Sequence, residues 1–132
     1  MSRLVLDPSA LIAYLKAEPE ATRLRDAMLA ASALSLSAAS LVEAGMVAEK
    51  LRGGGAIDLD AMLVELHVKI IPFTEEHAEL ARSAFRRFGK GRHPAGLNFG
   101  DCFSYALARA LGEPLLFVGN DFSQTDVQVA LY

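Results

Sequence analysis

Four acidic residues interrupt or close otherwise apolar stretches of this chain: Asp7, Glu43, Asp101 and Asp121. A charge in apolar surroundings is unfavourable unless it is paired or binds a cation. If the fold brings the four carboxylates together, they form a set of oxygen ligands of the kind that Mg²⁺ and Mn²⁺ prefer. A cation held in this way can activate water and stabilise charge on a phosphodiester, so a metal-dependent nuclease is one chemistry that these residues allow.

Each acid also has a structural explanation. A lone Asp after a strand is more often a turn or cap residue than a ligand. The pair Asn98 and Asp101 resembles a capping box with Asp in place of Glu. Glu43 is the hardest to explain in this way, because its neighbours are apolar or small. The joint placement of the four acids, rather than any one of them, favours the metal site.

The elements that would position these acids alternate between β-type and helical patterns. Short apolar runs predict strands at 3–6, 34–37, 68–72 and 114–118, with a further short strand at 127–130. Strands that alternate with helices predict an α/β fold, in which helices flank a central parallel sheet of four to five strands. Ligand sites in such sheets lie beyond the carboxyl ends of the strands, which is where the four acids fall.

Capping residues and helical spacing predict six helices. Ser9 is expected to cap a helix over 10–16, Thr74 a helix that presents Ala78, Ala81, Phe85 and Phe88 on one face, and Asn98 a helix that ends at Gly112. The other three repeat apolar residues near 24–31, 41–51 and 59–66.

A basic cluster precedes the helix of Asp101. Its members are Arg82, Arg86, Arg87, Lys90, Arg92 and His93. The cluster is either an ordinary solvated helix face or a rim that contacts phosphates beside the acidic site. His67 and His77 are expected at the surface, and Cys102 in the core or on a helix surface.

Composition limits the class of protein. The chain of 132 residues fits one domain, 1–132, and its net charge of −3 does not by itself indicate a nucleic-acid binder. The single Cys102 rules out an internal disulfide. The N-terminus does not resemble a signal peptide, and no apolar run reaches the roughly 20 residues that span a bilayer. These features predict a cytoplasmic protein without a membrane segment.

Three segments together resemble a known family. Residues 5–13 resemble the opening of PIN-domain ribonucleases, residues 89–106 are similar to the central motif of the VapC-type toxins in that family, and residues 114–127 to their closing motif. The resemblance covers nearly the whole chain in the right order, and the middle motif is the most specific.

The resemblance implies a PIN-like domain with Mg²⁺- or Mn²⁺-dependent endoribonuclease activity. It also implies a role as the toxin of a type II toxin–antitoxin pair, a small protein antitoxin that inserts into the active-site groove, and a homodimer. By position, Asp7, Glu43, Asp101 and Asp121 match the catalytic and metal-binding acids. Candidates for RNA contact are Ser9, Arg86, Lys90, Arg92 and Asp126, of which Asp126 also matches an acid that is sometimes counted with the metal site.

Two positions depart from the family pattern. Pro8 replaces the commoner Thr or Ser, and Asn120 stands where many relatives have an acid. An antitoxin is expected to bind a groove between the early helices, near Leu11, Leu15 and Leu24.

Other classes of protein remain as alternatives. A receiver-type signalling domain would need an acidic pair after the first strand, and an aspartyl phosphatase would need an Asp at position 9. An inactive PIN-like binding module is disfavoured by the four intact acids.

Overall fold

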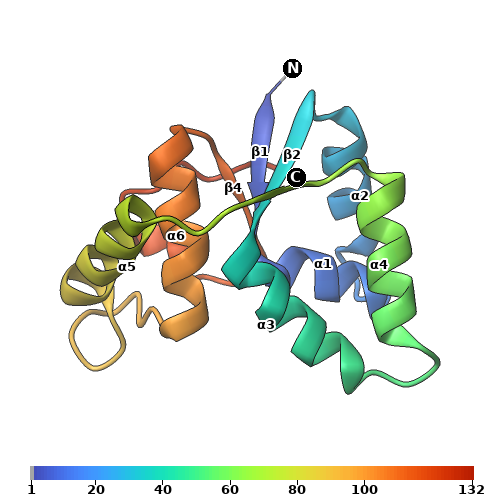
Figure 1. Cartoon of the computed structure of the whole chain (residues 1–132), viewed down its shortest axis with the longest axis horizontal. Coiled ribbons are helices and arrows are strands. Elements are labelled where there is room, and N and C mark those ends of the chain that lie inside the picture. Colours follow the sequence, from blue (N-terminus) through green and yellow to red (C-terminus); the bar gives the residue numbers. More distant parts are fainter. Residues whose placement is uncertain (1) are drawn as a thin grey trace.

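The computed structural model describes residues 2–132, which fold into a parallel sheet covered by helices (Figure 1). The order of elements is β1 (Arg3–Leu6), α1 (Pro8–Leu15), α2 (Ala21–Ala30), β2 (Ala33–Ser37), α3 (Ala38–Glu49), α4 (Gly55–Glu65), β3 (Lys69–Ile71), α5 (Glu75–Phe88), α6 (Phe99–Leu111), β4 (Leu115–Leu116) and the short 3₁₀ helix η1 (Phe122–Gln124). The predicted α/β class is confirmed, and the parallel sheet, expected to have four to five strands, has four.

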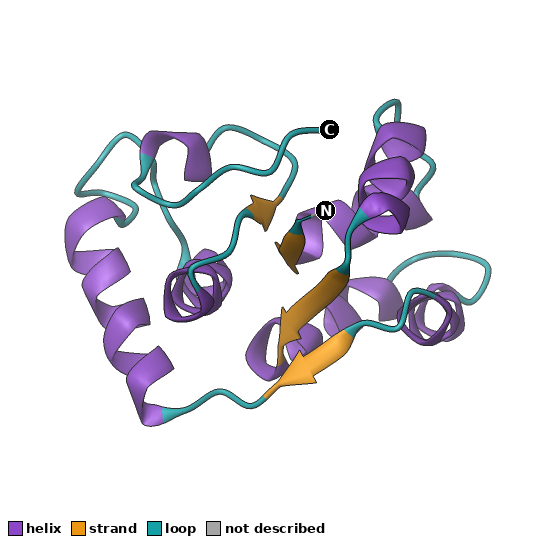
Figure 2. Cartoon of the chain, turned by 90° about the horizontal axis from the view of Figure 1, so that it is seen from above, coloured by secondary structure: helices purple, strands orange, loops and turns teal. Residues whose placement is uncertain are grey.

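The strands lie in the order β3-β2-β1-β4, and all neighbouring pairs are parallel. Side chains of β1 alternate between two cores. Leu4 and Leu6 pack with the core beneath α1 to α4, whereas Val5 packs with the core beneath α5 and α6. Figure 2 shows the helices on both sides of the sheet. Burial on both faces explains the continuous apolar runs of β1, at Leu4 to Leu6, and of β4.

Two strands are shorter than predicted, and the fifth is reduced to a single bridge. The Leu115 N–H donates to the Gln128 carbonyl, and the Leu115 carbonyl accepts from the Ala130 N–H. The segment 127–130 therefore pairs with β4 at one bridge only, between Leu115 and Val129. β4 ends early because the Val118 N–H donates to Ser9 Oγ at 3.0 Å instead of to another strand. Pro72 has no N–H with which to extend β3.

The start of α1 differs from the prediction. Asp7, not Ser9, is the N-cap, and its Oδ2 accepts a hydrogen bond from the Ser9 N–H at 2.9 Å. Pro8 occupies the first helical position, where its missing N–H has no consequence. The first acid of the expected site therefore also fixes the junction between β1 and α1.

The other caps agree better with the sequence. Thr74 caps α5, and Asn98 forms a full capping box with Asp101 at the start of α6. α6 ends at Gly112, whose φ of 65° is left-handed.

The buried face of α5 agrees only in part with the prediction. Ala81 is buried and Phe88 packs against the core, as expected, but His77 and Ala84 are buried as well and Phe85 is 41% exposed. Only 6% of His77 is exposed, so the expectation of a surface position is wrong. The physical reason is the helical phase, because positions 77, 81 and 84 lie on the same face, turned toward α6. Among residues 2–132, every helix is too short or too polar to cross a lipid bilayer.

Candidate active site

Asp7 lies at the carboxyl end of β1 and is 5% exposed. Oδ2 accepts from the Ser9 N–H, and Oδ1 accepts from the Ser104 hydroxyl at 2.6 Å. Burial raises the pKa of Asp7 above its ordinary value, the hydrogen bonds from Ser104 and Ser9 oppose the rise, and the charge of Asp121 adds to it. Asp7 is thus a buried carboxyl group held on both oxygens.

Glu43 lies on α3, the helix that follows β2, and its carboxylate reaches across to the first turn of α6. A Cβ atom built on Gly100 would lie 2.5 Å from Glu43 Cδ, so the absence of a side chain at Gly100 makes room for this carboxylate. Burial raises the pKa of Glu43 to about 7, and the charges of Asp7 and Asp101 add to the effect. Within the described part of the chain, no hydrogen bond or ion pair holds Glu43.

Asp101 is the third residue of α6. Its Oδ2 accepts from the Asn98 N–H at 3.0 Å, while Asn98 Oδ1 accepts from the Asp101 N–H at 2.9 Å. Burial raises the pKa of Asp101 to about 6. The Asn98 hydrogen bond opposes that rise, and the charges of Asp7 and Asp121 reinforce it. The structural role and the expected metal-site role of Asp101 therefore coexist in one carboxylate.

Asp121 is exposed in the turn that leads into η1. Its charge raises the pKa of both Asp7 and Asp101, so it lies near enough to affect them electrostatically. The structure thus brings all four acids to the edge of the sheet where α3 and α6 begin. This edge is at the lower end of the strands in Figure 1. No Lys or Arg of residues 2–132 forms an ion pair with any of them.

These acids are gathered but do not form a closed set of ligands. Within residues 2–132, no three His, Cys, Asp or Glu side chains stand close enough together to hold a metal ion as they are placed. The hydrogen bonds explain the spacing, because Asp7 is turned toward Ser9 and Ser104, and Asp101 toward Asn98. Their role as metal ligands stays a prediction.

Asp126 lies in a different network. It accepts hydrogen bonds from the Tyr105 hydroxyl at 2.6 Å and from Arg87 at 2.9 Å, and it pairs with Arg109 at 2.9 Å. Burial acts to raise the pKa of Asp126, but the Tyr105 and Arg87 hydrogen bonds and the two Arg charges outweigh it, so the pKa lies below its ordinary value. None of the four site acids contributes to this shift, so the structure does not bring Asp126 into the acidic cluster.

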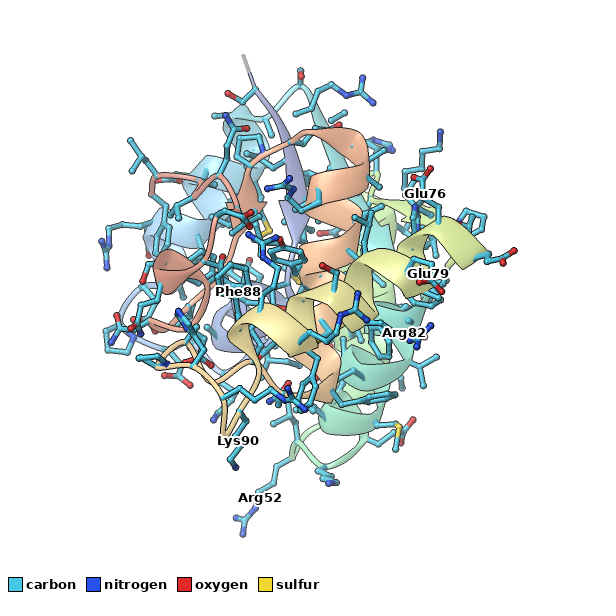
Figure 3. The ribbon with its side chains drawn as sticks, turned by 90° about the vertical axis from the view of Figure 1, so that its left-hand side faces the viewer. Arg52, Glu76, Glu79, Arg82, Phe88 and Lys90 are labelled. Carbon is cyan, nitrogen blue, oxygen red and sulfur yellow. The ribbon has the colours of Figure 1, made fainter. Side chains whose placement is uncertain are left out.

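The five Arg and Lys residues of the basic cluster divide into two groups. Arg82 pairs with Glu79 and Arg87 with Asp126, whereas Arg86, Lys90 and Arg92 have no acidic partner among residues 2–132. Figure 3 shows Lys90 and Arg52 extending from the same end of the molecule. Arg52, in the turn that follows α3, is a cation that the sequence-based candidates did not include.

The loop at 89–98 joins the basic cluster to Asp101. The Lys90 N–H donates to the Leu97 carbonyl at 2.9 Å, which closes the loop on itself. Gly91 has a φ of 85°, a conformation that favours glycine. Because the loop leads directly into the Asn98 cap, its unpaired cations are connected to the acidic edge by only a few residues.

Three residues with contacts at the site were not among the sequence-based candidates: Ser40, Gly100 and Ser104. Ser40 lies one turn before Glu43 on α3, and Ser104 lies one turn after Asp101 on α6. Both are fully buried, with their hydroxyl oxygens 3.4 Å apart. The signal available in the sequence was a polar residue three positions from an acid on the same helical face.

Comparison with known proteins agrees with this architecture. Residues 4–128 match the PIN domain family. Ribonuclease VapC28 of Mycobacterium tuberculosis is 48% identical over 130 residues, which cover 97% of this chain and 98% of the relative. Ribonuclease VapC30 of the same species is 46% identical over 125 residues, which cover 94% and 95%.

Solved structures show the same fold at lower identity. VapC20 of Mycobacterium tuberculosis, described as a toxin that cleaves the sarcin–ricin loop, has a TM-score of 0.77 at 20% identity and covers 96% of this chain and 98% of its own. A toxin–antitoxin complex from Klebsiella pneumoniae has a TM-score of 0.73 at 18% identity and covers 98% of both chains. The family match and the extended identity agree with the motifs at 5–13, 89–106 and 114–127, and they set aside the receiver and phosphatase alternatives. The chain belongs to the PIN-domain family and, within it, to the VapC ribonucleases.

Proposed function

We propose that this protein is a Mg²⁺-dependent endoribonuclease, in which Mn²⁺ can substitute, and that it acts as the toxin of a type II toxin–antitoxin pair in the cytoplasm. The observation that carries the proposal is the gathering of Asp7, Glu43 and Asp101, all with raised pKa values and none with a cationic partner among residues 2–132. Such a group of carboxyls is electrostatically unfavourable until a cation arrives. The identity of 46–48% to VapC ribonucleases supports the same assignment.

The donor set fits a hard divalent cation. The site contains carboxylate and hydroxyl oxygens, which are ligands suited to Mg²⁺ and Mn²⁺. Asp7 and Asp101 are proposed as the main ligands, with Glu43 and Asp121 completing the site. A bound cation would supply a Lewis acid that activates water and stabilises the charge that develops on the phosphodiester. Burial raises the pKa of Glu43 to about 7 in the metal-free protein, so binding of a cation would release its proton near neutral pH.

The RNA is proposed to approach over the unpaired cations of the last turn of α5 and the loop 89–98, which together are called the basic loop. Arg86, Lys90 and Arg92 are exposed and unpaired among the described residues, so their charges are available to phosphates. Ser9 is less suited to RNA contact than the sequence implied, because its hydroxyl accepts from the Val118 N–H. Asp126, paired with Arg87 and Arg109, is withdrawn from the proposed site.

A small antitoxin is proposed as the protein partner, as in the Klebsiella complex. Leu11 and Leu24 are fully buried and cannot line its groove, which corrects that part of the sequence-based expectation. An open groove of about 790 Å³ does lie between α1, α2 and α4, and Leu15 and Leu66 are among its lining residues. Apolar side chains of an antitoxin would suit this groove, with an Arg extended toward the acids.

A homodimer is the second proposed assembly. Val42 and Met46 on α3 and Phe99 on α6 are more than half exposed, and Phe99 is 80% exposed. Large exposed apolar side chains commonly mark protein interfaces. The measurement that tests this proposal is the molar mass of the purified protein in solution.

Metal-dependent cleavage of a structured RNA tests the activity. The purified protein is expected to cleave with Mg²⁺ or Mn²⁺, to stop with EDTA, and to recover when the metal is added in excess. Asp101→Asn, purified in the same way, controls for contaminating nucleases. The amide keeps the size and an acceptor for the Asn98 N–H but loses the charge that attracts the cation. Cleavage that persists in EDTA, or equal cleavage by the parent and the variant, contradicts the proposal. The cleavage would then come from a contaminating nuclease, and the inactive binding module would be favoured.

A further inference from the structure

Ser104 makes the shortest hydrogen bond to Asp7. Its Oγ donates to Asp7 Oδ1 at 2.6 Å, and both side chains are buried. A short O–H···O bond to a carboxylate away from water is among the stronger hydrogen bonds in proteins. The contact joins α6 to the end of β1 across 97 residues of sequence, so it forms only when the two elements are correctly placed.

The direction of a second hydrogen bond follows from counting protons. A serine hydroxyl has one proton to donate and two lone pairs to accept with. Because Ser104 uses its proton on Asp7, the contact of 3.4 Å to Ser40 requires Ser40 to be the donor. A chain of hydrogen bonds thus runs from α3 through α6 to the end of β1, beside Glu43 and Asp101.

The other oxygen of Asp7 is also fixed. Oδ2 accepts from the Ser9 N–H at 2.9 Å, a backbone contact that no side-chain substitution removes. With one donor on each oxygen, the plane of the carboxylate is set. The lone pairs that remain on the two oxygens are then the ones available to a ligand.

We propose that Ser104 is a positioning residue, whose hydroxyl orients the Asp7 carboxylate for binding a divalent cation. This inference rests on the proposed function, because it gives Asp7 the role of a metal ligand. Ser104 itself touches neither the cation nor the RNA. Partners that orient a metal ligand in this way typically change metal affinity by roughly 10- to 100-fold when removed.

The chain contains a matched control for this inference. Ser104→Ala and Ser40→Ala delete the same atom from two fully buried serines on helices that pack together, but only Ser104 contacts Asp7. The metal-free melting temperature of each variant reports any structural effect. The dissociation constant for Mn²⁺, measured by calorimetry without RNA, reports the orientation of Asp7.

We expect Ser104→Ala to raise the Mn²⁺ dissociation constant by roughly 10- to 100-fold. Ser40→Ala should leave it within about threefold, because its hydrogen bond is long and ends on a neutral group. Ser104→Thr keeps the hydroxyl and should bind Mn²⁺ more tightly than Ser104→Ala. In single-turnover cleavage at limiting Mn²⁺, Ser104→Ala should be slow with unchanged RNA affinity and should approach the parent rate as Mn²⁺ is raised.

Three results overturn the inference. The first is an unchanged Mn²⁺ dissociation constant in Ser104→Ala, and the second is an equal loss in Ser40→Ala, which would show that general packing is responsible. In both cases the parent still binds Mn²⁺ and cleaves RNA, so the proposed function survives. The third is a parent protein that neither binds Mn²⁺ nor cleaves RNA. In that case both the proposed function and this inference are wrong.

Discussion

The carboxylate of Glu43 rests against Gly100, at the place where any other residue would carry its side chain. The three atoms nearest to a Cβ built on Gly100 all belong to the Glu43 carboxyl group. Glu43 comes from α3 and Gly100 from the first turn of α6, so this contact joins the two acid-bearing helices. Gly100 thus makes room for the proposed site without contributing a polar atom to it.

Gly100→Ala should lower activity while changing stability little. Alanine in a helix is favoured over glycine by up to about 1 kcal/mol. The flexible Glu43 side chain can withdraw from the added methyl group, so the free energy of unfolding should change little. Displacement of a catalytic group by about 1 Å can reduce turnover by about 100-fold, and single-turnover RNA cleavage should fall on that scale.

A double-mutant cycle tests the cause of that effect. With Glu43→Ala as the background, the clash is absent and Gly100→Ala should stabilise the metal-free protein more than it does in the parent. Urea unfolding of the four proteins gives the coupling free energy. An identical effect of Gly100→Ala in both backgrounds would show that Glu43 does not rest against Gly100.

The raised pKa of Glu43 predicts how stability depends on pH. Its pKa rises from an ordinary 4.5 to about 7 in the folded protein. Between these values the folded state binds more protons than the unfolded state, so the stabilising contribution is present below pH 4.5 and is lost as the pH rises through about 7. In Glu43→Gln, stability should depend less on pH in the upper part of this range, above the pKa of about 6 of Asp101.

Melting curves in EDTA over this pH range provide the measurement. The parent should lose stability relative to Glu43→Gln as the pH rises, and a saturating divalent cation should reverse the trend because it binds the deprotonated carboxylates. Parallel curves for the two proteins in EDTA would mean that Glu43 titrates at its ordinary pKa.

The sequence was informative where the signal is local. Thr74 and Asn98 cap their helices as predicted, and Gly112 ends α6, because a cap depends on only a few neighbouring residues. Ser9 was the wrong cap because Asp7 competes for the same role two positions earlier. Pro8 could have decided between them, since proline prefers the first position of a helix.

Contacts between distant elements could not be predicted from the sequence. The four acids could be placed at one edge of the sheet from the order of the elements alone. The hydrogen bonds that turn Asp7 toward Ser104, and the withdrawal of Asp126 into a network with Tyr105, depend on how α6 packs. His77 was misplaced because a polar residue type outweighed its helical phase in the prediction.

Asp126→Asn should affect stability rather than metal binding. Loss of its charge weakens the contacts to Arg87, Arg109 and the buried Tyr105, at a cost of about 1–2 kcal/mol in the free energy of unfolding. Affinity for Mn²⁺ should stay within about twofold of the parent, because Asp126 does not affect the pKa of any site acid.

A second ion pair of α5 provides the control for Asp126. Glu79→Gln breaks an exposed pair with Arg82 and should change stability by less than about 0.5 kcal/mol. Urea unfolding and Mn²⁺ calorimetry of both variants are the measurements. A large loss of Mn²⁺ affinity in Asp126→Asn would contradict this prediction and show that Asp126 belongs to the metal site.

Neutralising the unpaired cations of the basic loop should weaken RNA binding without altering the metal site. The variant changes three residues to Gln: Arg86, Lys90 and Arg92. If they contact phosphates, RNA affinity should fall for all sequences, and the slope of log affinity against log salt should become shallower by about 0.7 per lost contact with single-stranded RNA. Mn²⁺ affinity should be unchanged.

The matched control removes the same charge from exposed cations on the opposite side of the sheet. Its three residues, also changed to Gln, are Lys16, Arg23 and Arg25. Both variants change the net charge of −3 to −6, so long-range attraction falls in each, and only direct phosphate contacts distinguish them.

RNA affinity at several salt concentrations and single-turnover cleavage at saturating protein give the comparison. The basic-loop variant should bind more weakly than the control while the cleavage rate of bound RNA changes little. Equal affinities and salt slopes for the two variants would show that the basic loop is an ordinary solvated surface and that the RNA path lies elsewhere around the acidic edge.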